Sequence, residues 1–234
     1  MRPRVEVVAI DCLMVRLFDV IAEDNMPWML AASERLRSGF GANLIDLVPS
    51  YTTLMVHYDL TALTPSQARE LIAEALTDLK PNPQARGQRH VLPVWYDLSV
   101  GPELNLLSEL SGLSVDEVIR RHSGCEYQVF ALGFAPGFAF MGLVEEALAA
   151  PRLSTPRKRV PAGSVGIAER QTAAYPLVSP GGWNLIGRTP SKLFDRERDG
   201  YSLLQPGDTV RFEAVSHAEF INLGGDDTPL ENMA

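Results

Sequence analysis

Residues 159–190 read RVPAGSVGIAERQTAAYPLVSPGGWNLIGRTP, and this stretch decides the fold class of the second half of the chain. Prolines and glycines divide it into apolar pieces that are each only long enough for a short strand. Such short pieces are typical of a closed or strongly curved sheet rather than a doubly wound one. We therefore expect a β-barrel here, with a further strand at residues 209–213.

The residues before this stretch predict a strand, two helices and a long strand. Residues 91–98 and 125–134 are apolar and rich in aromatic side chains, which favours strands. Helices are expected over residues 103–110 and 114–122, and Ser114, with Glu117 three residues further on, is placed to cap the second. The second domain is therefore predicted to be a β-barrel carrying two helices.

The first part of the chain shows a different order of elements. Strand-like runs at residues 5–10 and 12–18 precede a helical pattern at 22–38, and strand-like runs at 43–50 and 52–60 precede a second helix. In that second helix, Thr64 is a candidate N-cap, Pro65 occupies the first helical position and Gln67 completes a capping box. The order ββαββα predicts a small α+β domain.

A polar segment with two prolines, KPNPQARGQRH at residues 80–90, is the best candidate linker. We place the boundary inside it, so that the predicted domains are residues 1–85 and 86–234. The fold class expected for the whole chain is α+β.

Composition limits the classes of partner. The chain has 234 residues and a formal net charge of −8, which argues against nucleic acid and against an anionic membrane surface. Its two cysteines, Cys12 and Cys125, lie among apolar neighbours, which fits small buried side chains in a reducing compartment. Charged residues interrupt the apolar N-terminal run, so neither a signal sequence nor a membrane span is expected there, and we expect a cytoplasmic protein.

Familiar catalytic motifs are missing from the sequence. The four histidines are widely separated, so no metal site is expected. No glycine-rich phosphate-binding motif occurs, and therefore no nucleotide site is indicated. The AGSVG segment around Ser164 lacks the first glycine of a nucleophile elbow, so a serine that bonds backbone or substrate is the better interpretation.

Two features point to a binding site. Phe134, Phe138 and Phe140 flank a Pro-Gly turn, where they form either a corner of the core or the wall of an apolar cleft. A basic segment with three prolines follows at residues 151–164, and it is either a solvated loop or a site for a carboxylate or phosphate.

Long motifs carry a resemblance to a known family. FALGFAPGFAFMG (130–142), PRLSTPRKRVPAGSVGIAERQTAAYP (151–176) and SPGGWNLIGRTPSKLFD (179–195) resemble the KipI/PxpB family, also described as allophanate hydrolase subunit 1. DLVPSYTTLMVHYD (46–59) and LLQPGDTVRF (203–212) extend the resemblance along nearly the whole chain. It implies a small α+β domain followed by a cyclophilin-like β-barrel.

The resemblance also implies a function through partners. Members act as the B-type (PxpB) component of a bacterial ATP-dependent 5-oxoprolinase, which converts 5-oxo-L-proline to L-glutamate, together with a homologous KipA/PxpC-like component and a LamB/YcsF-like component. The chain is thus expected to be inactive alone, and ATP is expected to be used by the complex. Two alternatives stay open within the family: an inhibitor of a sensor histidine kinase, and a carboxyltransferase module of urea metabolism. Peptidyl-prolyl isomerase activity rests on the fold alone.

Candidate site residues follow from the motifs and the charge pattern. Substrates of this family are anionic or pass through anionic intermediates, so arginines in proline- and glycine-rich loops are the candidates for anion binding. The predicted substrate-binding residues are Arg157, Arg159, Ser164, Gln171, Thr172, Tyr175, Arg188 and Thr189. The predicted cleft wall or partner surface is Phe134, Phe138, Phe140 and Trp183.

The sequence departs from the family pattern at two positions. Glu169 and Ala173 stand where the resemblance leads us to expect glycines. A bulkier, charged loop is expected to alter the geometry of the substrate or partner site.

Overall fold

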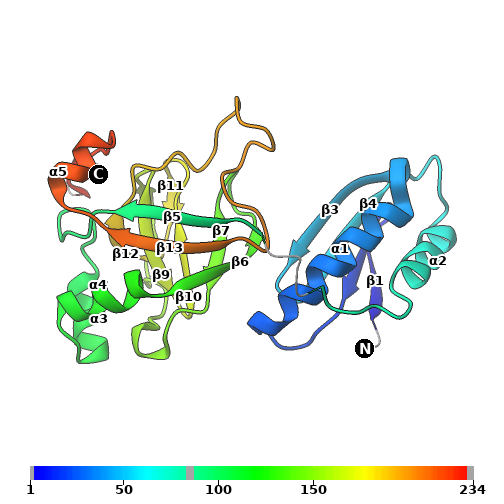
Figure 1. Cartoon of the computed structure of the whole chain (residues 1–234), viewed down its shortest axis with the longest axis horizontal. Coiled ribbons are helices and arrows are strands. Elements are labelled where there is room, and N and C mark those ends of the chain that lie inside the picture. The colour runs from blue at the N-terminus through cyan, green and yellow to red at the C-terminus, as the bar shows by residue number, and fades with distance from the viewer. Residues whose placement is uncertain (1–2, 83–86, 231–234) are drawn as a thin grey trace. The chain divides into compact units, whose positions relative to one another are not determined.

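The computed structural model describes residues 3–82 and 87–230. The chain divides into two compact units, unit 1 (residues 1–87) and unit 2 (residues 88–234), drawn together in Figure 1. The predicted boundary between residues 85 and 86 lies outside the described residues.

Unit 1 is built from antiparallel strands and two helices. Its strands β1 (Arg4–Ala9), β2 (Cys12–Arg16), β3 (Leu44–Ser50) and β4 (Thr53–Tyr58) pair in the order β1–β2–β4–β3. Helix α1 (Met26–Phe40) follows β2 and α2 (Pro65–Ala75) follows β4, and short 3-10 turns lie at Glu23–Asn25 and Gly41–Asn43.

The helix ends of unit 1 follow local chemistry. The Thr64 hydroxyl accepts from the backbone N–H of Gln67, and the Gln67 side chain accepts from the backbone N–H of Thr64, so the predicted capping box is confirmed. Helix α1 begins later than predicted because Pro27 lies in its first turn, where a missing N–H costs nothing.

One face of the unit 1 sheet is its core. Alternate residues of β2 and β4 are buried on the side of the helices, namely Leu13, Val15, Leu54, Val56 and Tyr58. The residues between them, including Cys12 and His57, are half-buried and point to the opposite face.

Unit 2 is a curved, mainly antiparallel sheet. Among the described strands the order is β5 (Arg89–Val94), β13 (Thr209–Ala214), β6 (Glu126–Leu132), β7 (Ala139–Gly142), β10 (Gln171–Ala174), β9 (Ser164–Ala168) and β12 (Asn184–Arg188). The β5–β13 pair is parallel. Strands β8 (Arg157–Val160) and β11 (Ser179–Gly181) form a separate antiparallel ribbon, and a 3-10 turn lies at Glu146–Leu148.

The predicted closed barrel is wrong in one respect. Edge strands β5 and β12 form no continuous ladder within the described residues; they meet at one bridge, in which Trp95 and Arg188 exchange two backbone hydrogen bonds of 2.9 Å. Directly after Trp95 the chain enters a turn in which Asp97 accepts from Ser99, so the pairing does not continue. The sheet is therefore open between its edges apart from this contact.

The helices of unit 2 are more numerous than predicted. Helices α3 (Leu104–Ser111) and α4 (Val115–Gly124) lie where the sequence predicts them, and a further helix, α5 (His217–Asn222), follows β13. Ser216 and Glu219 form a capping box at the start of α5. That Ser-x-x-Glu spacing is a readable signal in the sequence. None of the described helices combines the length and the apolar character needed to cross a bilayer.

We expect each unit to fold by itself. Residues 1–82 and 87–234, expressed separately, should each give a cooperative urea transition with native-like circular dichroism, because each unit has its own buried core. A cut after Gly124 is the matched control. It separates β5 from β6, both of which pair with β13, and should abolish cooperative folding. Two disordered fragments from the first cut would contradict the division.

Candidate functional site

The stretch 159–190 folds into the end of β8 and the whole of β9, β10, β11 and β12. Its glycines stand where backbones come close together. A Cβ on Gly163, which has φ +81°, would lie 2.3 Å from the carbonyl oxygen of Thr189, and one on Gly181 would lie 2.3 Å from the Tyr175 hydroxyl. Side chains at these positions would push the strands apart.

Aromatic rings gather on one side of these strands. Phe138 lies edge-on to Tyr175 and to Trp183, with ring centroids 5.2 and 5.6 Å apart, and all three residues are buried. Phe140 is half-buried beside Phe138. Phe134 is different, because it is 62% exposed and held at φ +70°. Its ring lies edge-on to Phe138, with centroids 5.2 Å apart, so the exposed ring borders the buried aromatic cluster.

Arg188 is the most informative of the predicted residues. It ends β12 opposite Ser164 and is only 1% exposed. Its Nη1 donates to the carbonyl oxygens of Asp226 and Thr228, at 2.7 and 2.9 Å. Its Nε and Nη2, and the Ser164 hydroxyl, are buried without a hydrogen-bond partner among the described residues. A buried cation with free donors fits the oxygens of an anion.

The electrostatics of Arg188 support that interpretation. Burial lowers the pKa of the guanidinium, and the negative charges of Asp226 and Asp227 oppose this effect. The carboxylate of Asp226 lies 4.0 Å from Nη1 and is itself 62% exposed. The charge of Arg188 is thus only partly neutralised by its own chain.

Tyr175 and Thr189 lie next to Arg188 and Ser164. The backbone N–H of Tyr175 donates to the Ser164 carbonyl at 2.9 Å, and the N–H of Thr189 donates to the Gly163 carbonyl at 2.8 Å. We call Ser164, Tyr175, Arg188 and Thr189 the Arg188 site. The fold brings together half of the predicted substrate-binding residues here.

Arg157 has a partner that the sequence did not reveal. It forms an ion pair with Glu103, whose other carboxylate oxygen accepts from the backbone N–H of Leu185 at 2.8 Å. Glu103 is 8% exposed, so this pair ties β8 to β12 in the interior. Nη1 of Arg157 is buried without a partner among the described residues, which leaves one donor available.

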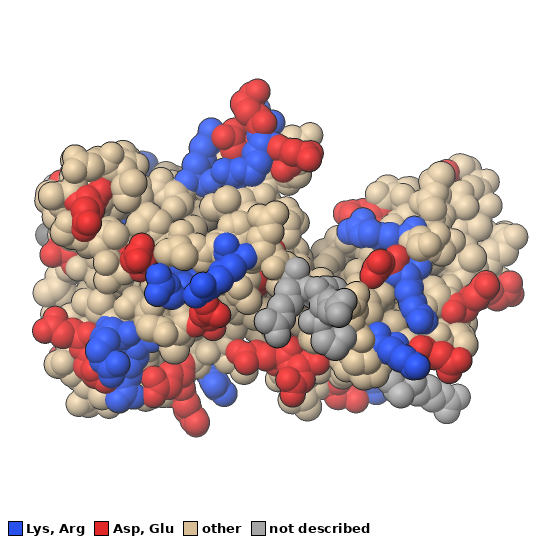
Figure 2. Space-filling view, viewed as in Figure 1, with Lys and Arg blue, Asp and Glu red and all other residues tan. Residues whose placement is uncertain are grey.

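The remaining residues of the basic segment lie at the surface. Lys158 and Arg159 are exposed, and the Arg152 guanidinium lies 5.9 Å from the centre of the Trp183 ring. Figure 2 shows acidic and basic residues interspersed over the visible face of unit 2.

Thr172 turns away from the Arg188 site into the core. Its hydroxyl donates to the Gly166 carbonyl at 3.1 Å and lies 2.9 Å from Nε2 of His122, while Nδ1 of His122 lies 2.8 Å from the Tyr96 hydroxyl. Because Thr172 already donates its proton, His122 Nε2 must donate to it, and Nδ1 then accepts from Tyr96. Burial lowers the pKa of His122 to about 3. Thr172 is thus part of a buried polar network.

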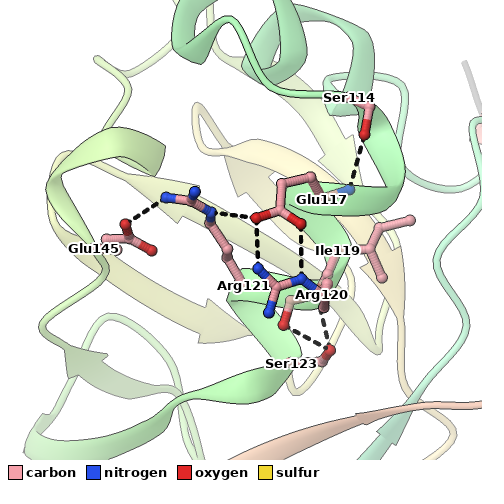
Figure 3. Close-up of polar contacts among 7 residues, drawn as sticks. All are labelled: Ser114, Glu117, Ile119, Arg120, Arg121, Ser123 and Glu145. Atoms are coloured by element: carbon pink, nitrogen blue, oxygen red, sulfur yellow. Dashed lines mark hydrogen bonds and ion pairs between the residues drawn. The ribbon is translucent and has the colours of Figure 1, made fainter.

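Charged side chains of α4, the helix that carries His122, form a hydrogen-bonded network. As Figure 3 shows, Glu117 accepts from both Arg120 and Arg121, and Arg121 also reaches Glu145 at 2.6 Å. Hydrogen bonds from Arg120 and Arg121 lower the pKa of Glu117 to about 2. The Ser114 hydroxyl accepts from the Glu117 N–H, as the sequence predicts. Within this network the Arg121–Glu145 pair links α4 to the segment that follows β7, and none of these residues is part of the Arg188 site.

The two residues that stand where the resemblance leads us to expect glycines lie in the β9–β10 hairpin. Glu169 lies at φ +51°, a conformation that glycine adopts without strain, in the turn between β9 and β10. Ala173 is fully buried against the aromatic cluster. Gln171, between them, is half-buried at the start of β10.

Metal-ligating side chains come together elsewhere. Among the described residues, the group of three or more that could hold a metal ion is Asp11, Cys12 and His57 in unit 1. Both cysteines are unpaired and half-buried, where the sequence predicts buried ones.

One family model and several named proteins match the chain. The family model for "carboxyltransferase domain, subdomain C and D" matches residues 3–204. The chain is 34% identical over 229 residues to the B-type subunit of 5-oxoprolinase from Bacillus subtilis, covering 94% of this chain and 95% of the relative. It is 38% identical over 210 residues to the B-type subunit of 5-oxoprolinase from Escherichia coli O157:H7, covering 86% of this chain and 94% of the relative.

Solved structures show the same fold within longer chains. The crystal structure of TTHA0988 is 36% identical, with a TM-score of 0.76 over 88% of this chain, and this chain spans 40% of it. The Kluyveromyces lactis urea carboxylase is 14% identical, with a TM-score of 0.72 over 93% of this chain, which spans 22% of that enzyme. The latter likeness concerns the fold alone.

Proposed function

The chain belongs to the carboxyltransferase subdomain C and D family, the KipI/PxpB family that its motifs indicated, and from this membership we propose that it is the PxpB component of an ATP-dependent 5-oxoprolinase. The observation that carries the proposal is identity above 30% along almost the whole length of two relatives named as that component. The complex opens 5-oxo-L-proline to L-glutamate in the cytoplasm, where the unpaired cysteines stay reduced.

The Arg188 site supports this reaction by its chemistry. Opening the lactam with ATP involves an anionic substrate and a phosphorylated intermediate, and both carry oxygens that a guanidinium binds. Arg188 offers two unpaired donors in a water-poor setting, where such contacts are strong. The third nitrogen, Nη1, already donates to the carbonyls of Asp226 and Thr228, so Nε and Nη2 are the donors that would bind the anion.

The partner surface is proposed to include Phe134. The relatives are named as one subunit of an enzyme, which implies an assembly, and the KipA/PxpC-like and LamB/YcsF-like components are the expected partners. An exposed aromatic ring on a fixed loop loses little conformational entropy when a partner covers it. ATP is used by the assembly, with no site for it assigned to this chain.

We expect the isolated chain to be catalytically silent and to bind its KipA/PxpC-like partner. Phe134→Ala should weaken that binding at least about tenfold, equivalent to about 1.4 kcal/mol, because a buried ring would be lost from the interface. The measurements are co-purification, calorimetric titration and ATP-dependent release of glutamate.

Tyr201→Ala provides a matched control. Tyr201 is 59% exposed and also has a positive φ, so its loss removes a similar ring from another loop of unit 2. It should leave binding unchanged. Robust 5-oxoprolinase turnover by the chain alone would overturn the proposal, and inhibition of a histidine kinase without binding to the KipA/PxpC-like partner would favour the inhibitor alternative.

A further inference from the structure

Three side chains with metal-binding chemistry meet in unit 1, although they are far apart in sequence. Asp11 lies in the turn before β2, Cys12 begins β2, and His57 lies in β4. Cys12 and His57 are direct partners in the antiparallel β2–β4 ladder. Partners of this kind have Cβ atoms about 5 Å apart on the same face of the sheet. The strand register thus sets a thiol beside an imidazole.

The carboxylate completes the group. Oδ2 of Asp11 lies 3.1 Å from Nε2 of His57, and one ligand atom from each of the three residues lies within 4.8 Å of the others. The turn that carries Asp11 is fastened to β4, because Tyr58 donates from its backbone N–H to the Asp11 carbonyl and from its hydroxyl to the Ile10 carbonyl. The three donors are therefore held by ladder and turn hydrogen bonds.

We propose that Asp11, Cys12 and His57 form a zinc-binding site on the face of the unit 1 sheet opposite the helices. Zn²⁺ binds sulfur, nitrogen and oxygen donors of these types, with bonds of about 2.0–2.3 Å. Tetrahedral ligands at such bond lengths lie roughly 3.3 Å apart, close to the observed separation of the carboxylate and imidazole. The Cys12 thiol gives its proton to solvent when it binds, and water takes the fourth position.

Access and chemistry favour zinc over other ions. The side chains of His57 and Asp11 are 31% and 35% exposed, so an ion can enter without unfolding of the sheet. A thiolate and an imidazole are poor ligands for Mg²⁺ and Ca²⁺, which take oxygen donors. The site links the β1–β2 turn to β4, and zinc bound there should stabilise unit 1. It is independent of the Arg188 site and of the proposed 5-oxoprolinase activity.

The test uses the full chain stripped of metal with a chelator. Calorimetric titration with Zn²⁺ should show one ion per chain, and the thermal midpoint should rise on addition. Cys12→Ser and His57→Gln should each lower the affinity at least tenfold, and Asp11→Asn should lower it as well. Substitution with Co²⁺ should give the near-ultraviolet thiolate charge-transfer band in the parent and not in Cys12→Ser.

Two variants serve as controls. Cys125→Ser removes the other cysteine, and His217→Gln breaks a histidine–aspartate pair, with Asp227 at 2.8 Å, that is not part of this group. Both should bind Zn²⁺ like the parent. Absence of binding by the folded parent, equal binding by Cys12→Ser, or a Co²⁺ spectrum without the thiolate band would each overturn the proposal. Circular dichroism establishes that each variant is folded.

Discussion

Replacing Arg188 with lysine is expected to lower the turnover of the assembled 5-oxoprolinase at least about tenfold, equivalent to about 1.4 kcal/mol of transition-state stabilisation. Lysine keeps the charge but removes the planar fork that offers Nε and Nη2 to an anion. The measurement is glutamate release by the complex at saturating ATP, with the thermal midpoint and the assembly state recorded for the same preparation.

Variants of two further arginines are needed to interpret that result. Arg159 is also a predicted anion-binding residue, so Arg159→Lys, at an exposed residue of β8, is expected to lower turnover to a similar extent. Arg211→Lys is the matched control, because Arg211 is half-buried in β13 and ion-paired with Glu213. It should turn over like the parent. Normal turnover by both Arg159→Lys and Arg188→Lys would show that these arginines are structural.

A shortened chain separates anion binding from a purely structural role of Arg188. The only side-chain hydrogen bonds of Arg188 within the described residues go to the carbonyls of Asp226 and Thr228. If Arg188 serves to hold that segment, a chain that ends at Gly225 should lose as much activity as Arg188→Lys. If Arg188 binds an anion, the complex with the shortened chain should stay active. Introducing Arg188→Lys into that shortened chain should then remove the activity.

Below about pH 6.5 the protein is expected to lose stability because of His122. Burial holds the pKa of His122 at about 3, whereas the unfolded chain has the ordinary value of about 6.5. Between these values the unfolded state binds a proton that the folded state does not. The stabilisation is therefore complete above pH 6.5 and falls by up to about 1.4 kcal/mol per pH unit toward pH 3.

Urea unfolding between pH 7 and pH 5 isolates this effect. Glu117, with its pKa lowered to about 2 by hydrogen bonds from Arg120 and Arg121, loses its stabilising contribution only as the pH falls below about 4.5. His122→Gln should flatten the slope whatever its stability at pH 7, and His217→Gln, at an exposed residue, should keep it. A parent and a His122→Gln variant with equal slopes would contradict the buried neutral imidazole.

The sequence alone determined the local structure and the family. Thr64 and Gln67 predicted the start of α2, and Ser114 and Glu117 the start of α4, because a capping interaction involves only residues three apart. The long motifs of residues 130–195 identified the family before any fold was known. The same Ser-x-x-Glu spacing at Ser216 and Glu219 marks the start of α5, so this helix, which we did not predict, was also predictable from the sequence.

Tertiary structure decided which polar residues are buried and with what partner. Arg157 and Glu103 lie 54 positions apart, and Cys12 and His57 lie in separate strands, so only the fold brings each pair together. Thr172 and Tyr175 are near neighbours in one segment, yet Thr172 enters the core with His122 while Tyr175 packs in the aromatic cluster. Successive strand residues point to opposite faces, and which face is core depends on contacts made by distant parts of the chain.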